Sequence, residues 1–238
     1  MLQMNLGNVI IGNGLIARGL TGIEFGRATL VLASGVSDSQ ETRVKAFRRE
    51  VDLVEQAMDR YQGLHILYCS TCSVESGVQA PYTSHKLAME RWIVEKAQSF
   101  KVFRLPQVVG LVHNPTLVSH FVDAILHGWL LTVQARVSRN LMDVRDFARK
   151  AALVVRRNAS VGVPQNIASS TQVPVADIVA EIARLLGREA RTELVDAGYS
   201  QTIETRFLHE LLPADDPLFD PGHWRRVLQH YVPLMAAI

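Results

Sequence analysis

A tyrosine and a lysine stand four positions apart in "PYTSHKLAMERW" (residues 81–92), at the predicted start of an amphipathic helix. At this spacing Tyr82 and Lys86 lie on one face, one helical turn apart. A free phenol has a pKa of about 10 and is a poor acid or base at neutral pH, but a nearby ammonium favours the phenolate and lowers that pKa. The pair therefore predicts acid/base chemistry, with an ordinary first helical turn as the alternative.

A glycine-rich turn, "GNGLIA" from Gly12 to Ala17, follows a short apolar strand and opens a helix. In the G-x-G-x-x-[GA] pattern the first glycine permits a tight turn, and the second lets the backbone approach a pyrophosphate. The helix N-terminus also favours an anion, and Ala17 keeps the helix close to the sheet. This context indicates dinucleotide binding, with a ligand-free turn as the alternative. Arg18 could meet the 2′-phosphate of NADP, or lie on the surface.

The same pattern calls for an acidic residue about 20 positions further on, at the end of the second strand, to bind a ribose. Here the second strand, "ATLVLASG", ends in Ser34 and Gly35, and the first acid after it is Asp38 in "SDSQE". We interpret Asp38 as an N-cap or first-turn residue of the next helix, a position that aspartate favours. The sequence therefore lacks a good ribose ligand.

Strands and helices alternate over the first 110 residues and must position these side chains. Apolar strands are predicted at Val9–Ile11 and Ala28–Gly35, and in "LHILYCST" and "KVFRLPQVVG". One helix carries the apolar series Val44, Phe47, Val51, Val54 and Met58, and the next spans residues 81–100. The alternation predicts an α/β fold with a parallel sheet covered on both faces.

The second half of the chain shows further helical patterns. A helix is predicted over Pro115–Leu131, a strand leading into a helix in "LMDVRDFARKAALVVRR", and a strand-like tail in "QNIASS". The clearest amphipathic helix runs from Val175 to Leu186 and stops at Gly187. Beyond Arg188 the pattern weakens into an irregular, proline-rich surface segment.

The composition fits a globular protein, with 48% hydrophobic and 20% charged residues in a chain of 238. This length suits one domain, or a main domain with a small C-terminal appendage. The formal net charge of +2 argues against nucleic acid as the main partner. No apolar run approaches the ~18 residues of a membrane span, and the N-terminus lacks the features of a signal peptide, so we expect a cytoplasmic protein.

Cys69 and Cys72 have C-x-x-C spacing in "LYCSTCS". A zinc site needs about four ligands, and the sequence contains no second cluster of cysteine and histidine. A redox pair normally opens a helix, whereas this one ends a predicted strand. We therefore expect no metal site and regard a redox role as the weaker interpretation.

The ordered set of Gly12-x-Gly14-x-x-Ala17, "CSTCSV", Tyr82-x-x-x-Lys86, "FRLPQVVG" and "RNLMDVRDFA" resembles the extended short-chain dehydrogenase/reductase family, in its nucleotide-sugar epimerase/dehydratase branch. The resemblance covers about residues 8 to 185. It implies a Rossmann-like doubly wound sheet and a catalytic set of Thr71, Tyr82 and Lys86, with Ser70 and Ser73 as flanking hydroxyl candidates. Lys86 would also hold the nicotinamide ribose.

The resemblance implies further contacts, which are carried over more loosely. Substrate would meet Ser73, Gln107 and Arg139, and Asp146 lies in the same segment as Arg139. The implied cofactor, NAD or NADP, would be bound by residues from the glycine turn, the end of the second strand, the helix of Tyr82 and the loop after "FRL": Gly12, Asn13, Gly14, Leu15, Ile16, Arg18, Ala33, Ser34, Gly35, Tyr82, Lys86 and Pro106.

The chain departs from the family by its length. If "ATLVLASGV" is the family's fourth strand, about two strands on the adenosine side are missing, which explains the absent ribose acid. Only ten residues, from Cys72 to Pro81, separate Thr71 from Tyr82, and Glu75 and Ser76 replace the family's usual Tyr-Gly. The first strand then lies at a sheet edge, which invites pairing into a homodimer.

We predict a Rossmann-like domain over residues 1–165, with substrate-side insertions around 111–140, and a helical substrate-side region over 166–238. The predicted activity is NAD(P)-dependent reduction or epimerisation of a nucleotide-linked sugar. Dehydration is disfavoured, because Glu75 is the only acid near the hydroxyl residues and lies too far along. The alternative is a degenerate member that binds a nucleotide or a partner protein without catalysis.

Overall fold

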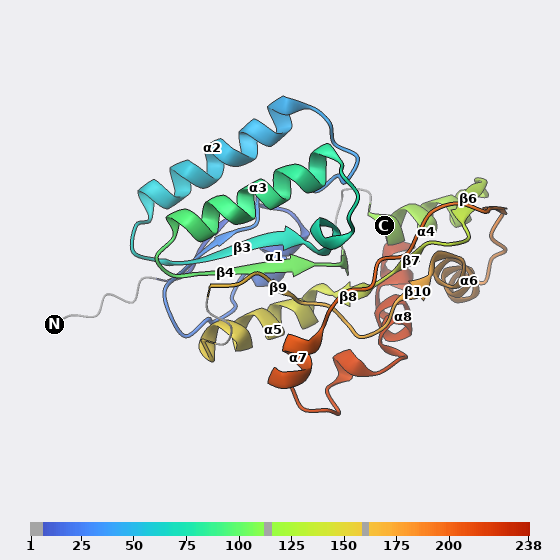
Figure 1. Cartoon of the computed structure of the whole chain (residues 1–238). Coiled ribbons are helices and arrows are strands. Elements are labelled where there is room, and N and C mark those ends of the chain that lie inside the picture. Colours follow the sequence, from blue (N-terminus) through green and yellow to red (C-terminus); the bar gives the residue numbers. More distant parts are fainter. Residues whose placement is uncertain (1–6, 112–115, 159–161) are drawn as a thin grey trace. The chain divides into compact units, whose positions relative to one another are not determined.

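The computed structural model describes residues 7–111, 116–158 and 162–238, which form two compact units (Figure 1). Unit 1 comprises Met1–Leu105 and Phe147–Ile167, and unit 2 comprises Pro106–Asp146 and Ala168–Ile238. Unit 2 thus includes the stretch where the sequence predicts substrate-side insertions, together with the C-terminal part of the chain. In the described part of the chain, no helix is both long and apolar enough to cross a membrane.

Unit 1 contains a parallel sheet in the order β1-β2-β3-β4-β9. The strands are β1 (Val9–Ile11), β2 (Thr29–Leu32), β3 (His65–Thr71), β4 (Phe100–Leu105) and β9 (Gln165–Asn166). This sheet confirms the predicted α/β fold. Within the described residues β1 pairs only with β2, so the first strand does lie at the edge, as the shortened family pattern predicts.

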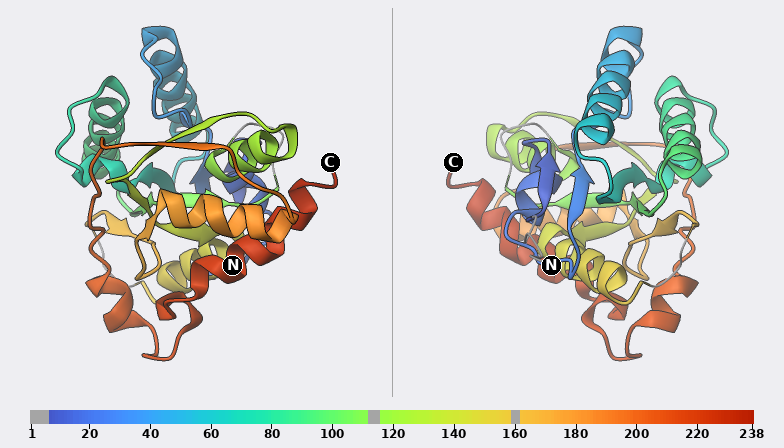
Figure 2. Two further views of the ribbon diagram at one scale, coloured as in Figure 1. Left: turned by 90° about the vertical axis from the view of Figure 1, so that its right-hand side faces the viewer. Right: turned by 90° about the vertical axis from the view of Figure 1, so that its left-hand side faces the viewer.

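Helices α2 (Val44–Arg60) and α3 (Pro81–Lys96) cover one face of this sheet, and both views of Figure 2 show them side by side. Alternate residues of the strands point to this face because the side-chain period of a strand is two. Leu30 and Leu32 of β2 thereby pack in one core with Ile93 of α3 and Val54 of α2. Unit 1 also contains α1 (Leu15–Leu20), the short 3-10 helix η1 (Cys72–Glu75) and most of α5 (Val144–Arg156).

The opposite face of the sheet packs against α5. Phe103 of β4 meets Phe147 of α5 edge to face, with ring centroids 6.4 Å apart. The strand β8 (Leu141–Asp143) runs directly into α5, as the sequence predicts for "LMDVRDFARKAALVVRR". Helices on both faces make this a doubly wound sheet, and buried strands of this kind read as continuous apolar runs.

Unit 2 is built from strand pairs and helices. Its pairs are β5 (Gln107–Val109) with β8, β6 (Leu131–Gln134) with β11 (Thr192–Val195), and β7 (Ser138–Arg139) with β10 (Val173–Pro174). Its helices are α4 (Leu117–His127), α6 (Val175–Leu186), α7 (Arg206–Leu211), the 3-10 helix η2 (Pro217–Phe219) and α8 (His223–Met235).

The helices of unit 2 agree only in part with those predicted from the sequence. The helix from Val175 to Leu186 is confirmed, and Gly187 ends it in the left-handed conformation with φ of 60°. The helix predicted over Pro115–Leu131 is too long at its end, because Gly128 stops α4 with φ of 66° and Leu131 begins β6. Its predicted start at Pro115 lies outside the described residues. Helix α8 was not predicted.

Candidate functional site

The candidate site is at the carboxyl ends of β1, β2 and β3. Because these strands are parallel and adjacent, the turns that follow them emerge at the same edge of the sheet. Gly12 follows β1, Ala33 follows β2, and Thr71 is the last residue of β3. The sheet thus brings together the glycine turn, the loop 33–36 and the predicted catalytic hydroxyl.

Position 12 requires glycine, both because of its backbone conformation and because of its close neighbours. Its φ is 132°, and a Cβ there would collide with the carbonyl of Ala33. The Ala33 amide donates to the Ile11 carbonyl at 2.9 Å, which holds the turn against the start of the loop after β2. A side chain at this position would separate the two segments, so the first glycine of the motif permits the tight turn that the pattern predicts.

The space beside Gly14 is open. Gly14 is the N-cap of α1, and a Cβ added there meets nothing within 4 Å. Leu15 and Ile16 form the first turn of α1, and Ala17 is buried, as predicted. Arg18 donates through Nε to the Asn13 carbonyl at 2.9 Å, so its guanidinium also braces the turn. The turn therefore combines a closed side at Gly12 with an open side at Gly14.

The loop 33–36 carries a buried hydroxyl. Ser34 Oγ is buried and makes no hydrogen bond among the described residues. A buried hydroxyl without a partner costs free energy, so such a group is a candidate for bonding to a ligand. Gly35 follows, and a Cβ there would collide with Lys86 Nζ and would lie 2.7 Å from Glu50 Oε1.

The interpretation of Asp38 as an N-cap or first-turn residue of the next helix is wrong. Helix α2 begins at Val44 with Arg43 as its N-cap. Asp38 Oδ1 instead accepts from the Gln40 amide at 2.8 Å in a separate turn. Arg43 is held in turn by Glu41, which accepts from its backbone amide at 2.8 Å. An extra turn before the helix displaces Asp38 from the predicted position.

Thr71, Ser73 and Tyr82 lie together. Thr71 Oγ1 donates to Ser73 Oγ at 3.1 Å and accepts from the Ser73 amide at 3.2 Å. Tyr82, in the first turn of α3, is buried and lies close enough to the Thr71 side chain for Thr71 to lower its pKa. The structure therefore unites a hydroxyl at the end of β3 with the phenol of α3.

Lys86 is bound to a residue that the sequence did not single out. Its Nζ donates to Glu50 Oε1 on α2 at 2.8 Å, and the side chains of Lys86 and Glu50 are 3% and 0% exposed. Tyr68 of β3 donates to the same oxygen at 2.7 Å, and His85 Nε2 lies 3.0 Å from Oε2. Lys86 thus belongs to a buried cluster around Glu50.

The expected effect of Lys86 on Tyr82 is absent from this arrangement. Burial raises the pKa of Tyr82 to about 12, although the hydrogen bond with Thr71 lowers it, and the nearby charges of Glu50 and Asp38 raise it further. The prediction that Lys86 lowers the Tyr82 pKa is therefore wrong for this state of the protein. The physical reason is that Glu50 neutralises the lysine.

A signal for Glu50 was present in the sequence. Glu50 occupies an internal position of the α2 apolar stripe, three residues after Phe47 and four before Val54. An acid on a buried stripe needs partners, because burying a charge is costly unless it is paired and hydrogen-bonded. His85 directly precedes Lys86, yet nothing in the sequence indicates that it and Tyr68 would reach the same carboxylate.

The two cysteines are free thiols, Cys72 being buried. Burial raises the pKa of Cys69 to about 12, although the charge of Lys86 lowers it, and burial also raises the pKa of Cys72. Thiols of this kind are weak nucleophiles and weak metal ligands. No group of three potential metal ligands occurs in the part of the chain that the structure describes.

The remaining predicted residues, Pro106, Gln107 and Arg139, belong to unit 2. The Gln107 amide donates to the Asn140 carbonyl at 3.1 Å where β5 joins β8. Arg139 is exposed on β7, and its Nη1 donates to the Ser138 carbonyl at 3.0 Å. Asp146 lies 3.8 Å from His223 Nε2. These contacts support the fold of unit 2.

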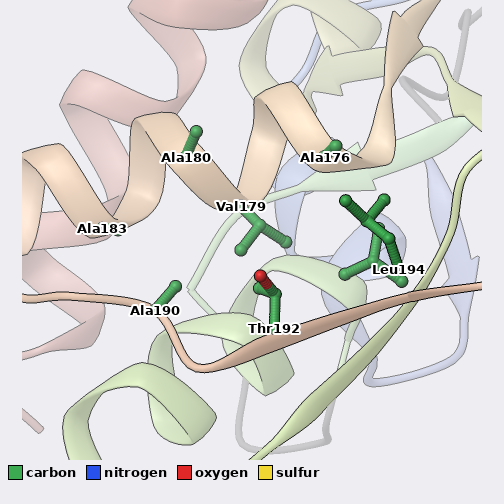
Figure 3. A pocket seen from close by; sticks show the side chains of 8 residues that line it. Ala176, Val179, Ala180, Ala183, Ala190, Thr192 and Leu194 are labelled. Atoms are coloured by element: carbon green, nitrogen blue, oxygen red, sulfur yellow. The ribbon is translucent and has the colours of Figure 1, made fainter.

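Unit 2 also contains a cavity of about 270 Å³, between α6 and the strand β11 (Figure 3). It is lined by Val133, Ala176, Val179, Ala180, Ala183, Ala190, Thr192 and Leu194. None of these side chains ionises, so the cavity offers no acid or base. The predicted acid/base residues Thr71 and Tyr82 lie at the carboxyl edge of the unit 1 sheet.

Comparison with solved structures identifies the fold. No protein-family model matches the sequence, and no curated protein matches it. MoeE5 in complex with UDP-glucuronic acid and NAD aligns with a TM-score of 0.72 and 19% identity, over 86% of this chain and 78% of that chain. RMD from Pseudomonas aeruginosa, complexed with NADPH, aligns with a TM-score of 0.69 and 14% identity, over 88% and 81% of the two chains.

UDP-glucose 4-epimerase from Thermus thermophilus, complexed with NAD, aligns with a TM-score of 0.67 and 16% identity, over 87% of this chain and 77% of that chain. The predicted resemblance is confirmed at the level of the fold, since similarity at such identity carries no residue roles. The chain has the Rossmann-like fold of these three structures, in a shorter form.

Proposed function

We propose that this protein is an NAD(P)-dependent oxidoreductase or epimerase that acts on a carbonyl or hydroxyl group of a nucleotide-linked sugar. The observation that carries the proposal is that Tyr82 lies close to Thr71 at the carboxyl edge of a parallel sheet, where ligands of such folds bind. The structurally similar MoeE5 and RMD, solved with NAD and NADPH, support the choice of cofactor class.

The residues around the glycine turn fit a dinucleotide. The space beside Gly14 is open, and the buried Ser34 hydroxyl has no partner among the described residues. When bound, the nicotinamide would accept hydride from a substrate carbon and return it. The chain would hold the cofactor with Gly12 to Ile16, Arg18, the loop 33–35, Tyr82, Lys86 and Pro106. The choice between NAD and NADP stays open.

Thr71 and Tyr82 would handle the proton. In reduction Tyr82 Oη gives its proton to the substrate oxygen while the carbon receives hydride, and in oxidation the phenolate takes the proton back. Thr71 donates a hydrogen bond to the same oxygen. Ser73, Gln107 and Arg139 would bind the rest of the substrate. A homodimer and a cytoplasmic location stay predictions from the sequence.

A second candidate is a degenerate protein that binds a nucleotide or a partner protein without turnover. Two observations favour it: burial raises the pKa of Tyr82 to about 12, and Lys86 is paired with Glu50. A phenol with so high a pKa transfers its proton poorly near neutral pH. This candidate predicts nucleotide binding, or no binding, with no change of substrate.

The test is titration of the purified protein with NADH and with NADPH, followed by cofactor fluorescence, and then turnover of a 4-keto sugar nucleotide. The proposal expects binding of one cofactor below millimolar concentration and a loss of turnover in Tyr82→Phe. Tyr61→Phe, at the C-cap of α2, is the matched control and should keep full activity. Absence of binding at millimolar cofactor would exclude the enzyme, whereas binding with no turnover would favour the second candidate.

A further inference from the structure

Glu50 is a fully buried carboxylate in the middle of α2, with 0% of its side chain exposed. Its neighbours along the buried stripe of the helix, Val54 and Ala57, are apolar. A lone charge at such a position would be strongly destabilising. The carboxylate therefore needs partners, and their identity indicates what it does.

The partners come from three separate segments of unit 1. Lys86 Nζ and the Tyr68 hydroxyl donate to Oε1 at 2.8 and 2.7 Å, and His85 Nε2 and the Val36 amide meet Oε2 at 3.0 and 2.8 Å. Burial would raise the pKa of Glu50, but the hydrogen bonds of His85, Lys86 and Tyr68 and the lysine charge lower it to about 2. Glu50 is thus ionised at neutral pH.

The pair of Glu50 and Lys86 also shapes the loop after β2. A Cβ on Gly35 would collide with Lys86 Nζ and reach Glu50 Oε1, so the loop passes directly over the pair. The Val36 amide is bonded to Glu50. The same carboxylate therefore fixes both the candidate cofactor loop and the lysine.

The groups that face Tyr82 come from several elements. Thr71 at the end of β3 lies close to it. Glu50 of α2, Asp38 of the loop before α2 and Tyr68 of β3 act on it through their charges. Lys86 lies one turn further along α3. Of these, only the lysine is cationic. Its salt bridge leaves the pair of Glu50 and Lys86 with no net charge.

We infer that Glu50 is a positioning residue that holds Lys86 and the loop 33–36, and thereby controls how readily Tyr82 gives up its proton. The catalytic consequence rests on the proposed function, but the control of Tyr82 does not. The protonation of Tyr82 should follow the net charge of the Glu50 and Lys86 pair, because a nearby positive charge favours the phenolate.

The experiment is a pH titration of the ligand-free, full-length protein labelled with ¹³C at the tyrosine ζ carbon, followed by NMR. Tyr82→Phe assigns the signal, and circular dichroism at each pH confirms that the protein stays folded. In Glu50→Gln the pair becomes positive, and the Tyr82 midpoint should fall by roughly 1 pH unit or more. In Glu50→Gln/Lys86→Gln the pair is neutral again, and the midpoint should return toward the wild-type value.

Glu90→Gln is the matched control, since Glu90 is also buried on unit 1 but is bound to Arg104 rather than to Lys86. It should leave the Tyr82 midpoint unchanged. If Glu50→Gln does not fold, Glu50→Asp keeps the charge but shortens the reach to Lys86, and it should lower the midpoint by a smaller amount. A Tyr82 midpoint that stays constant or rises in the folded Glu50 variants would overturn the inference.

Cofactor binding is measured on the same variants as a separate readout. If wild type binds neither NADH nor NADPH, the proposed function fails, while the tyrosine titration still decides the role of Glu50. If wild type binds cofactor but the Tyr82 titration midpoint is the same in wild type and in the Glu50 variants, the proposed function survives and this inference fails.

Discussion

Two buried carboxylates of unit 1, Glu50 and Glu90, each bind a basic side chain, but the two clusters differ in the basic residue that they use. The Glu50 cluster consists of Glu50 with Lys86, Tyr68, His85 and the Val36 amide. The Glu90 cluster consists of Glu90 and Glu75 with Arg104, Ser70 and Asn166.

Arg104 binds both carboxylates of the Glu90 cluster through its planar guanidinium. Its Nη2 lies 2.6 Å from Glu90 Oε2 and its Nη1 lies 2.5 Å from Glu75 Oε1, so one planar group joins α3 to η1. Ser70 donates to Glu90 at 2.5 Å, directly before Thr71. A guanidinium stays charged at every accessible pH and suits such a brace.

Lys86 gives the Glu50 cluster a different property. An ammonium is a point charge on a flexible stem, and its pKa and partner change readily when it is buried. The comparison teaches that the Glu90 cluster holds η1, the segment after Thr71, against α3. In the Glu50 cluster, by contrast, the Lys86 ammonium can change its partner. Breaking each cluster should therefore have different consequences.

The largest effect is expected from Glu50→Ala. This change leaves the Lys86 ammonium buried without its counter-ion and removes the acceptor of the Tyr68 hydroxyl and the Val36 amide. Unpairing a buried ion pair costs about 3–5 kcal/mol, so the free energy of unfolding in a urea titration should fall by that amount. Asp59→Ala, on the exposed part of the same helix, should change it by less than about 0.5 kcal/mol. A loss below about 1 kcal/mol for Glu50→Ala would show that Lys86 finds another partner.

Glu90→Ala should cost less, about 2–3 kcal/mol. Arg104 keeps Glu75 as a partner, and its side chain is 15% exposed, so water can solvate part of the guanidinium. The same urea titration measures the loss. A cost larger than that of Glu50→Ala would reverse the proposed order and make the Glu90 cluster the main electrostatic brace of unit 1.

The strands and helices that carry the site were easier to predict from the sequence than the pairing of its charged side chains. The apolar runs located β1 and the helix of Tyr82, because local spacing and burial set these features. The edge position of β1 was implied by the shortened family pattern. The association of Thr71 with Tyr82 was implied by the resemblance to the dehydrogenase/reductase family and not by the spacing of the residues.

The sequence did not predict how the charges pair. Whether Lys86 faces Tyr82 or Glu50 depends on how α2 and α3 pack on the sheet, and side-chain spacing within α3 leaves both open. Helix α8 was missed because its pattern is broken by His230 and Pro233, although it buries Trp224 and Leu228. Tertiary packing decides both cases.

Gly35→Ala tests how tightly the loop lies over the Glu50 cluster. The added Cβ would collide with Lys86 Nζ, so the loop must move, and overpacking of this kind costs about 1–3 kcal/mol. Gly14→Ala is the matched change at an open position of the same sheet edge. Its φ of −78° suits alanine, which offsets the weaker capping by alanine, so the free energy of unfolding should change by less than about 1 kcal/mol. Thermal and urea unfolding of both variants measure the difference. Equal costs would mean that the loop yields freely and that the Glu50 cluster does not constrain it.

The smallest effect is expected from Ser34→Ala, and its sign is the informative part. The Ser34 hydroxyl is buried without a partner in the described part of the chain, so removing it should leave the free energy of unfolding unchanged or raise it by up to about 1 kcal/mol. Affinity for NADH or NADPH, measured by fluorescence, should fall if the hydroxyl serves the cofactor. Ser70→Ala is the matched change in the Glu90 cluster, and it should lower stability because it removes the hydrogen bond to Glu90. A stability loss in Ser34→Ala equal to that in Ser70→Ala would mean that both hydroxyls are structural and that the Ser34 hydroxyl does not serve a ligand.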